Sequence, residues 1–132
     1  MGKKARWLAA WKDKLIVDLN AHQFSGEIAD SDHVHYRGMV GASPDRVMLK
    51  TRYGVVGLPW TKLPPNKLLA VSASFIWPQS PEAVDRQWLC AVFASETGQT
   101  DAAQQFAEAA AKAKPQLREE IPLLLPAKSA AR

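Results

Sequence analysis

Basic side chains recur at intervals of two or four residues in two short stretches of this chain. They are His33, His35, Arg37, Arg46, Lys50 and Arg52. Successive side chains of a β-strand point to opposite faces, so the spacing within each stretch places the basic groups on one face. Arginine and lysine supply the charge contacts that dominate affinity for phosphate chains, and a histidine can also titrate. The spacing therefore predicts a polyanion-binding face, with these candidate residues: His35, Arg37, Arg46, Lys50 and Arg52.

Two of the histidines are also spaced so that both rings could reach one metal ion. His33 and His35 lie two residues apart, and Asp30 or Asp32 could add an oxygen ligand. A third strong ligand is not evident, since His22 lies beyond the predicted first helix. We therefore expect no metal site and no cofactor.

The nucleophilic side chains lie in apolar surroundings. Cys90 is the single cysteine and has Leu89 and Val92 close by in sequence, which is typical of a buried thiol in a helix. Ser72 and Ser74 fall in a hydrophobic helix, where hydroxyls usually bond back to the helix backbone. The chain has no glycine-rich phosphate loop and no pair of carboxylates with catalytic spacing. We therefore expect that the protein is not an enzyme.

The basic stretches belong to a predicted β unit over residues 24–63. Apolar residues alternate through this unit, with Val34, Tyr36 and Val40 facing the core on one strand and Met39 facing outward. The inward side of the next strand is Val47, Leu49, Thr51 and Tyr53. Turn residues at 30–32, 43–45 and 53–54 separate the strands. The pattern predicts a four- or five-stranded antiparallel meander, which tends to curl into a small barrel.

Helices should flank this β unit. Residues 4–20 carry an amphipathic pattern that includes Trp7, Trp11 and Leu15, and residues 65–125 form a helical region. In that region, prolines and glycines divide a short helix after Pro65 from two longer helices over 80–96 and 100–114. The fold class expected is α+β, as one compact domain over 1–126 followed by a disordered tail at 127–132.

Composition restricts the cellular locations expected for the protein. The chain has 132 residues, a formal net charge of +4 at pH 7 and five tryptophans. No apolar run is long enough to span a membrane, and the N-terminus lacks the apolar core of a secretory signal. A single cysteine allows no internal disulfide. We expect a cytoplasmic chain with no membrane partner, and leave open its oligomeric state and whether it is part of a larger protein.

Two segments resemble known families. The stretch Asp45–Lys50, followed by Tyr53-Gly54 and Leu58–Leu63, resembles the bacterial form of the SLA1 homology domain 1, an SH3-like small barrel. Residues 84–115 resemble a tetratricopeptide helical hairpin through their small residues and terminal proline: Ala91, Ala94, Gly98, Ala103, Ala107, Ala110 and Pro115. Both resemblances imply an interaction module of the kind appended to multidomain bacterial proteins.

The function expected is a noncatalytic protein-interaction or scaffold module, with a protein or a neighbouring domain as partner. Trp60, Phe75 and Trp77 are candidates for the docking surface, because aromatic residues carry much interface energy. They could equally pack the barrel against the helices. The alternative function is binding of nucleic acid or another polyanion through the basic face. Against it, no outward aromatic residue is predicted between the cations, and the N-terminal helix could cover the face.

Overall fold

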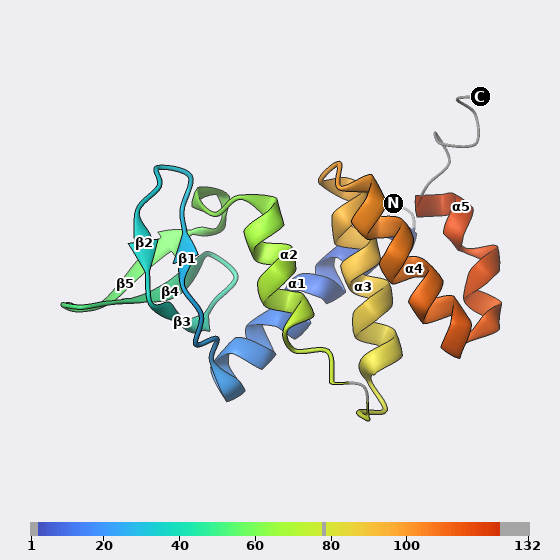
Figure 1. Cartoon of the computed structure of the whole chain (residues 1–132), viewed down its shortest axis with the longest axis horizontal. Helices are drawn as coiled ribbons and strands as arrows, with labels where there is room; N and C mark the ends of the chain where they lie inside the picture. Colours follow the sequence, from blue (N-terminus) through green and yellow to red (C-terminus); the bar gives the residue numbers. More distant parts are fainter. Residues whose placement is uncertain (1–2, 78, 125–132) are drawn as a thin grey trace. The chain divides into compact units, whose positions relative to one another are not determined.

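The computed structural model describes residues 3–77 and 79–124 (Figure 1). They form an N-terminal helix, two small antiparallel sheets and a set of C-terminal helices, which confirms the predicted α+β class. The chain divides into two compact units. Lys12–Ser74 form the first, called here the sheet unit, and the described residues up to Trp11 and from Phe75 onward form the second, the helix unit. The single domain expected over 1–126 stays a prediction, and the tail at 127–132 lies outside the described residues.

Helix α1 (Lys3–His22) is the amphipathic helix predicted over residues 4–20. Its first residues belong to the helix unit and those from Lys12 onward to the sheet unit. Leu15 and Leu19 are buried in the sheet unit, with exposed fractions of 2% and 0%. The four-residue spacing of these leucines places them on one face of the helix, which explains why they are buried together.

The sheet unit contains five short strands. β1 (Ile28–Ala29) and β2 (His35–Tyr36) form a two-stranded sheet, in which Ile28 pairs with Tyr36. The second sheet is an antiparallel meander in the order β3-β4-β5, made by β3 (Gly38–Ala42), β4 (Arg46–Thr51) and β5 (Gly54–Pro59). An isolated bridge from Phe24 to Met39 extends the pairing beyond β3. The predicted meander is therefore present as two small sheets.

The predicted alternation holds on β4 and on β2, where Tyr36 is buried and His35 is exposed, and it fails at Val34 and on β3. Val47 and Leu49 are both completely buried, as expected. Met39, predicted to face outward, is also completely buried, while Val34, predicted to face the core, is 49% exposed. The chain bends at Arg37 between β2 and β3, and the register shifts again between Met39 and Gly41. A single extra residue moves every following side chain to the opposite face, so the bend at Arg37 explains the burial of Met39. Val34 lies before β2 begins, where strand alternation does not apply.

The prediction that Tyr53 faces inward, as the last residue of the row on β4, is also wrong. Tyr53 lies in the turn between β4 and β5 and is 89% exposed. Strand alternation stops where a turn begins, so the parity of Val47 and Leu49 does not extend to it.

A short 3-10 helix, η1 (Trp60–Lys62), and helix α2 (Pro65–Ala73) complete the sheet unit. Pro65 occupies the first turn of α2, where its missing N–H costs nothing. Leu68, Leu69 and Val71 are buried. The Ser72 hydroxyl donates to Leu69 O at 3.0 Å, so this serine is used within its own helix, as the sequence predicted.

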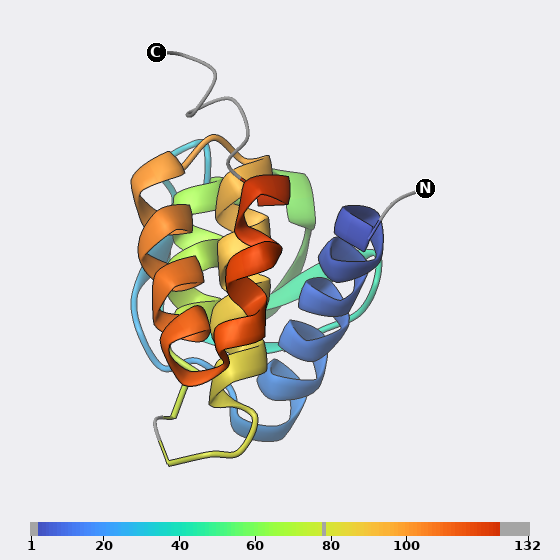
Figure 2. The same cartoon turned by 90° about the vertical axis from the view of Figure 1, so that its right-hand side faces the viewer.

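The helix unit is built around an antiparallel pair, α3 (Ala83–Glu96) and α4 (Thr100–Ala113). Figure 2 shows α3 (yellow) and α4 (orange) side by side, with the red segment of η2 (Pro115–Glu119) and α5 (Ile121–Leu124) beside them. Gly98, with φ of 80°, ends the first helix in the left-handed conformation that suits glycine. The helical hairpin predicted over 80–114 is therefore present.

Small residues and tryptophans fill the core of the helix unit. Its buried cluster is Trp88, Ala91, Val92, Ala107, Ala110 and Leu124. Trp7 meets Trp88 edge to face at 5.3 Å between ring centroids, and Trp11 stacks on Phe93 at 3.8 Å. Alanines on the facing sides of α3 and α4 allow the two helices to approach closely. The large tryptophan rings pack around this pair of helices. The Cys90 thiol is buried in the same unit.

No helix among the described residues combines the length and the apolar character that crossing a bilayer requires.

Candidate functional site

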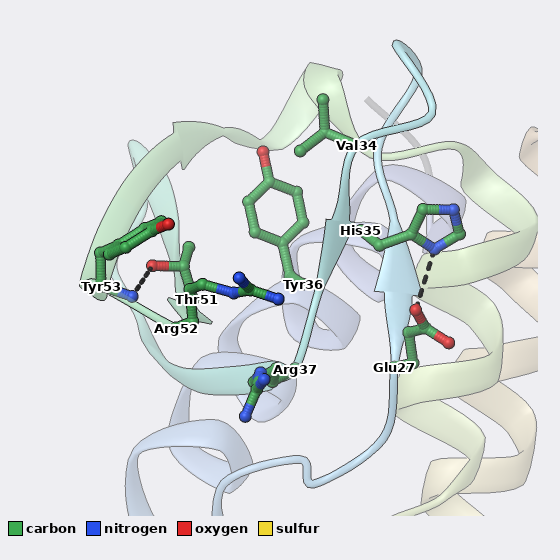
Figure 3. A pocket seen from close by; sticks show the side chains of 8 residues that line it. All are labelled: Glu27, Val34, His35, Tyr36, Arg37, Thr51, Arg52 and Tyr53. Atoms are coloured by element: carbon green, nitrogen blue, oxygen red, sulfur yellow. Dashed lines mark hydrogen bonds and ion pairs between the residues drawn. The ribbon is translucent and has the colours of Figure 1, made fainter.

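A surface pocket of about 710 Å³ lies in the sheet unit (Figure 3). Eight residues line it: Glu27, Val34, His35, Tyr36, Arg37, Thr51, Arg52 and Tyr53. They come from the β1–β2 sheet with its adjoining residues and from the turn between β4 and β5. The pocket therefore contains residues from both small sheets.

The β4–β5 turn is held by one threonine side chain. Thr51 Oγ1 accepts a hydrogen bond from the backbone N–H of Tyr53 at 3.0 Å and donates to Gly54 O at 2.9 Å. Only Arg52 and Tyr53 lie between the paired residues Thr51 and Gly54, so their side chains project from a tight two-residue turn. On the other side of the pocket, Arg37 N–H donates to Lys50 O at 2.8 Å and joins the β2–β3 connection to β4.

A hydrogen-bonded carboxylate fixes Tyr36 in the pocket. The Tyr36 hydroxyl donates to Asp30 Oδ2 at 2.9 Å, while Asp30 Oδ1 accepts from the backbone N–H of Asp32 at 2.8 Å and of Val34 at 3.0 Å. Burial raises the pKa of Asp30, but these hydrogen bonds outweigh it, so the pKa lies below its usual value. Burial, helped by the bond to Asp30, raises the pKa of Tyr36. At neutral pH the pair is therefore a carboxylate and a neutral phenol.

Positive charge dominates the lining of the pocket. Arg37 and Arg52 are exposed, and within the described part of the chain no ion pair involves either guanidinium. The one carboxylate of the lining, Glu27, lies 3.0 Å from Nδ1 of His35. Figure 3 shows both arginine side chains on the side of Tyr36 away from His35 and Glu27. The arrangement is suited to an anionic group.

The five polyanion-binding candidates are all exposed, so α1 does not cover them. They fall into two groups. His35, Arg37 and Arg52 line the pocket. Arg46 and Lys50 lie farther along β4, on the side opposite to the buried Val47 and Leu49. The single basic face expected from the sequence is therefore a pocket with a neighbouring strand surface.

Exposed apolar residues accompany these cations, and the sequence pattern did not predict them. Tyr53 is 89% exposed, and the guanidinium of Arg52 lies 6.0 Å from its ring centroid. On β5, Val55 is 52% exposed and Val56 is 39% exposed. The Tyr53-Gly54 pair was the available signal, because a residue before a turn glycine commonly belongs to the turn itself.

The three protein-interaction candidates have different environments. Trp60 is half-buried, its Nε1–H donates to Ser43 O at 2.8 Å, and Lys12 Nζ lies 5.0 Å from its ring centroid. Phe75 is buried and meets Trp77 edge to face at 6.4 Å. Trp77 is 42% exposed. Trp60 therefore packs inside the sheet unit, and Trp77 is the exposed aromatic of the three.

Three of the four candidate metal ligands are engaged in other side-chain contacts. His35 pairs with Glu27, Asp30 accepts the bonds described above, and Asp32 forms an ion pair with Lys62. The hydrogen-bonded ion pair with Asp32 raises the pKa of Lys62. Among the described residues, no group of three or more histidine, cysteine or acidic side chains is placed to hold a metal ion.

Comparisons with known proteins add no relative. No family model, no curated protein and no solved structure matches this chain. The resemblances to an SH3-like barrel and to a tetratricopeptide hairpin stay predictions.

Proposed function

We propose that this chain is a noncatalytic protein-interaction module and that its sheet unit carries the binding surface. The surface, called here the hairpin surface, combines exposed apolar residues with cations. It comprises exposed residues on both faces of the β4–β5 hairpin and in the adjoining segment 34–37: Val34, His35, Arg37, Arg46, Lys50, Arg52, Tyr53, Val55 and Val56. Exposed apolar side chains rimmed by charged ones are typical of protein-binding sites, and this combination is the observation that supports the proposal.

The apolar part of this surface supplies the driving force for association. Each apolar Å² removed from water contributes about 25 cal/mol, so covering Tyr53, Val55 and Val56 favours a partner with apolar side chains of its own. The surrounding arginines and lysine favour a partner with acidic groups and raise its rate of encounter. The predicted resemblances to interaction families are in keeping with this role. We place the module in the cytoplasm, because the single cysteine allows no internal disulfide, which is ordinary in a reducing compartment.

Selection from a displayed library of random peptides tests the proposal. We expect the full chain to enrich a family of related peptides, because the hairpin surface offers one defined set of contacts. Val55→Asp should weaken their binding by about ten-fold, since it places a charge in the apolar part of the surface. The matched control is Val17→Asp, which alters an exposed valine of α1 and should leave binding unchanged. No enrichment, or equal loss in both folded variants, would reject the proposal.

Binding of single-stranded nucleic acid is a second candidate function, and Tyr53 is the observation that favours it. The sequence predicted cations without an outward aromatic residue, but Tyr53 is exposed beside Arg52. Stacking of a base on an aromatic ring contributes about 1–3 kcal/mol, and neighbouring arginines neutralise phosphates. Arg37 is the second arginine of the same pocket.

Fluorescence anisotropy of a labelled oligonucleotide at increasing salt tests this second function. Binding that weakens steeply with salt, and that is reduced by both Tyr53→Ala and Arg52→Ala, would support it. Absence of binding at low salt would exclude it, as would equal binding by the Tyr53→Ala variant and the wild type.

A further inference from the structure

Strand β5 forms one edge of the three-stranded sheet. Within the described part of the chain, its ladder partner is β4 alone. Its sequence is Gly-Val-Val-Gly-Leu-Pro, with no charged residue, and Gly54, Val55 and Val56 are exposed. In an antiparallel ladder every second residue directs its N–H and C=O away from its partner, so β5 presents backbone groups along this edge.

Such an edge is unusual for a protein that only has to avoid aggregation. Natural sheets protect their edges with charged side chains, bulges, prolines or a covering segment. The pairing of β5 with β4 is regular from Thr51–Gly54 to Arg46–Pro59, and Pro59 at its end is the one protective residue. An uncharged, regular edge is the feature that strand-adding binding sites present to extended peptides.

Cations lie beside this edge on the outer face of the hairpin. Lys50 pairs directly with Val55, so both side chains are on the same face. Gly57 pairs with Met48, and a Cβ atom added at Gly57 would lie 2.9 Å from Arg46 Cδ and 3.4 Å from Arg46 Nη1. The Arg46 side chain therefore crosses over Gly57, and the missing side chain at 57 leaves the space that it occupies. Its guanidinium lies over β5, one strand closer to the edge than its own backbone.

We infer that β5 accepts an extended acidic peptide as an added strand, an inference that rests on the proposed protein-interaction function. The peptide residues opposite Val55 and Gly57 lie on the outer face, where their carboxylates reach Lys50 and Arg46. The residue between them lies on the inner face beside Val56 and is apolar. The ligand thus has the pattern acidic–apolar–acidic, because side chains two residues apart share a face of a strand.

Charge complementarity selects this occupant over a second copy of the chain. Two β5 strands paired with each other would bring the Lys50 and Arg46 side chains of both copies to one face, and like charges there disfavour association. The chain itself carries a net charge of +4. An acidic strand gains from the same cations that a second copy would have to oppose.

The test uses the full chain and a synthetic capped peptide whose centre is Glu-Val-Glu between threonines. Amide proton–nitrogen NMR spectra should show the largest shifts at Val55, Val56 and Gly57. Binding should weaken at least three-fold for the isomer with centre Val-Glu-Glu, which directs its carboxylates to opposite faces, and for the variants Lys50→Gln and Arg46→Gln. Lys112→Gln, which alters an exposed lysine of α4, is the matched control and should bind normally.

The outcomes separate this inference from the function on which it rests. Equal binding of the two peptide isomers, shifts away from β5, or dimers of the free chain paired through β5 would overturn the acidic-strand assignment. If peptides from the library selection lack the acidic–apolar–acidic pattern and contact the pocket, the interaction module stands and the strand assignment fails. If no peptide binds in either experiment, both fail.

Discussion

At the scale of single residues, Asp30 is the acidic group that holds the pocket residue Tyr36 in position. It is 4% exposed, yet it remains charged because two backbone N–H groups and the Tyr36 hydroxyl donate to it. A buried carboxylate is tolerated only where such donors replace water. The same bonds fix the turn at residues 30–34 and the position of the Tyr36 ring.

This carboxylate should make the protein sensitive to acid. The pKa of Asp30 is lower in the folded state than its ordinary value of 3.8, so the unfolded chain takes up the proton first. Its contribution to the free energy of unfolding is therefore present above pH 3.8 and is lost as the pH falls through the folded pKa. We expect Asp30→Asn to be less stable than wild type at neutral pH and to lose less stability on acidification.

Urea denaturation at a series of pH values measures this difference. Asp13→Asn, at an exposed position in the middle of α1, is the control and should follow the wild-type pH dependence. If the free energy of unfolding of Asp30→Asn fell with decreasing pH as steeply as that of the wild type, Asp30 would not be the source of the acid sensitivity.

At the scale of elements, the bend between β2 and β3 decides which side chains are buried. Gly38 follows Arg37 at this bend, and a Cβ atom at Gly38 would overlap the backbone carbonyl oxygen of Phe24. Backbone N–H and C=O groups of Phe24 and Met39 exchange hydrogen bonds of 2.8 Å in both directions. The close approach of these two segments therefore requires glycine at position 38.

Gly38→Ala should destabilise the protein by about 1–3 kcal/mol, because the added carbon meets backbone atoms that cannot move aside cheaply. Gly57→Ala is the matched comparison: its Cβ would meet the flexible Arg46 side chain, so the loss should be within about 0.5 kcal/mol. Chemical denaturation of both variants measures the difference. Equal stabilities would show that the contact with Phe24 does not constrain position 38.

The helix unit allows a similar test of its packing. Ala107 of α4 is completely buried, whereas Ala109 of the same helix is exposed. Ala107→Leu should lower the free energy of unfolding by about 1–3 kcal/mol, because the larger side chain has no space between α3 and α4. Ala109→Leu should change stability little. Thermal denaturation followed by circular dichroism compares them, and equal melting temperatures would contradict the close helix packing.

The elements were predictable where one local rule applied over the whole segment. Val47 and Leu49 were placed correctly because β4 is a regular strand, and α3 and α4 were found because Gly98 and Pro115 mark their ends. Met39 was placed on the wrong side because a bend interrupts the alternation, and Tyr53 because a turn does, while Val34 lies before β2 begins. Glycines at 38, 41 and 54 were the visible signs, but a glycine alone does not say which face follows it.

At the scale of the whole molecule, the candidate site could be predicted only in part. Alternation placed the five basic candidates outside, and all five are exposed. The pocket was not predictable, because it needs the β1–β2 sheet and the β4–β5 turn to approach each other in space. The exposed edge of β5 was also hidden, since whether a strand is central or at an edge depends on the order of strands in the sheet.

The central claim is that the hairpin surface of the sheet unit binds a protein partner. The most direct measurement is an NMR titration of the full chain with the peptide that the library selection enriches most. We predict amide shifts concentrated in residues 34–37 and 46–58, and little change in α3 and α4. Shifts concentrated in the helix unit, for instance around Trp77, with none on the hairpin surface, would contradict the claim.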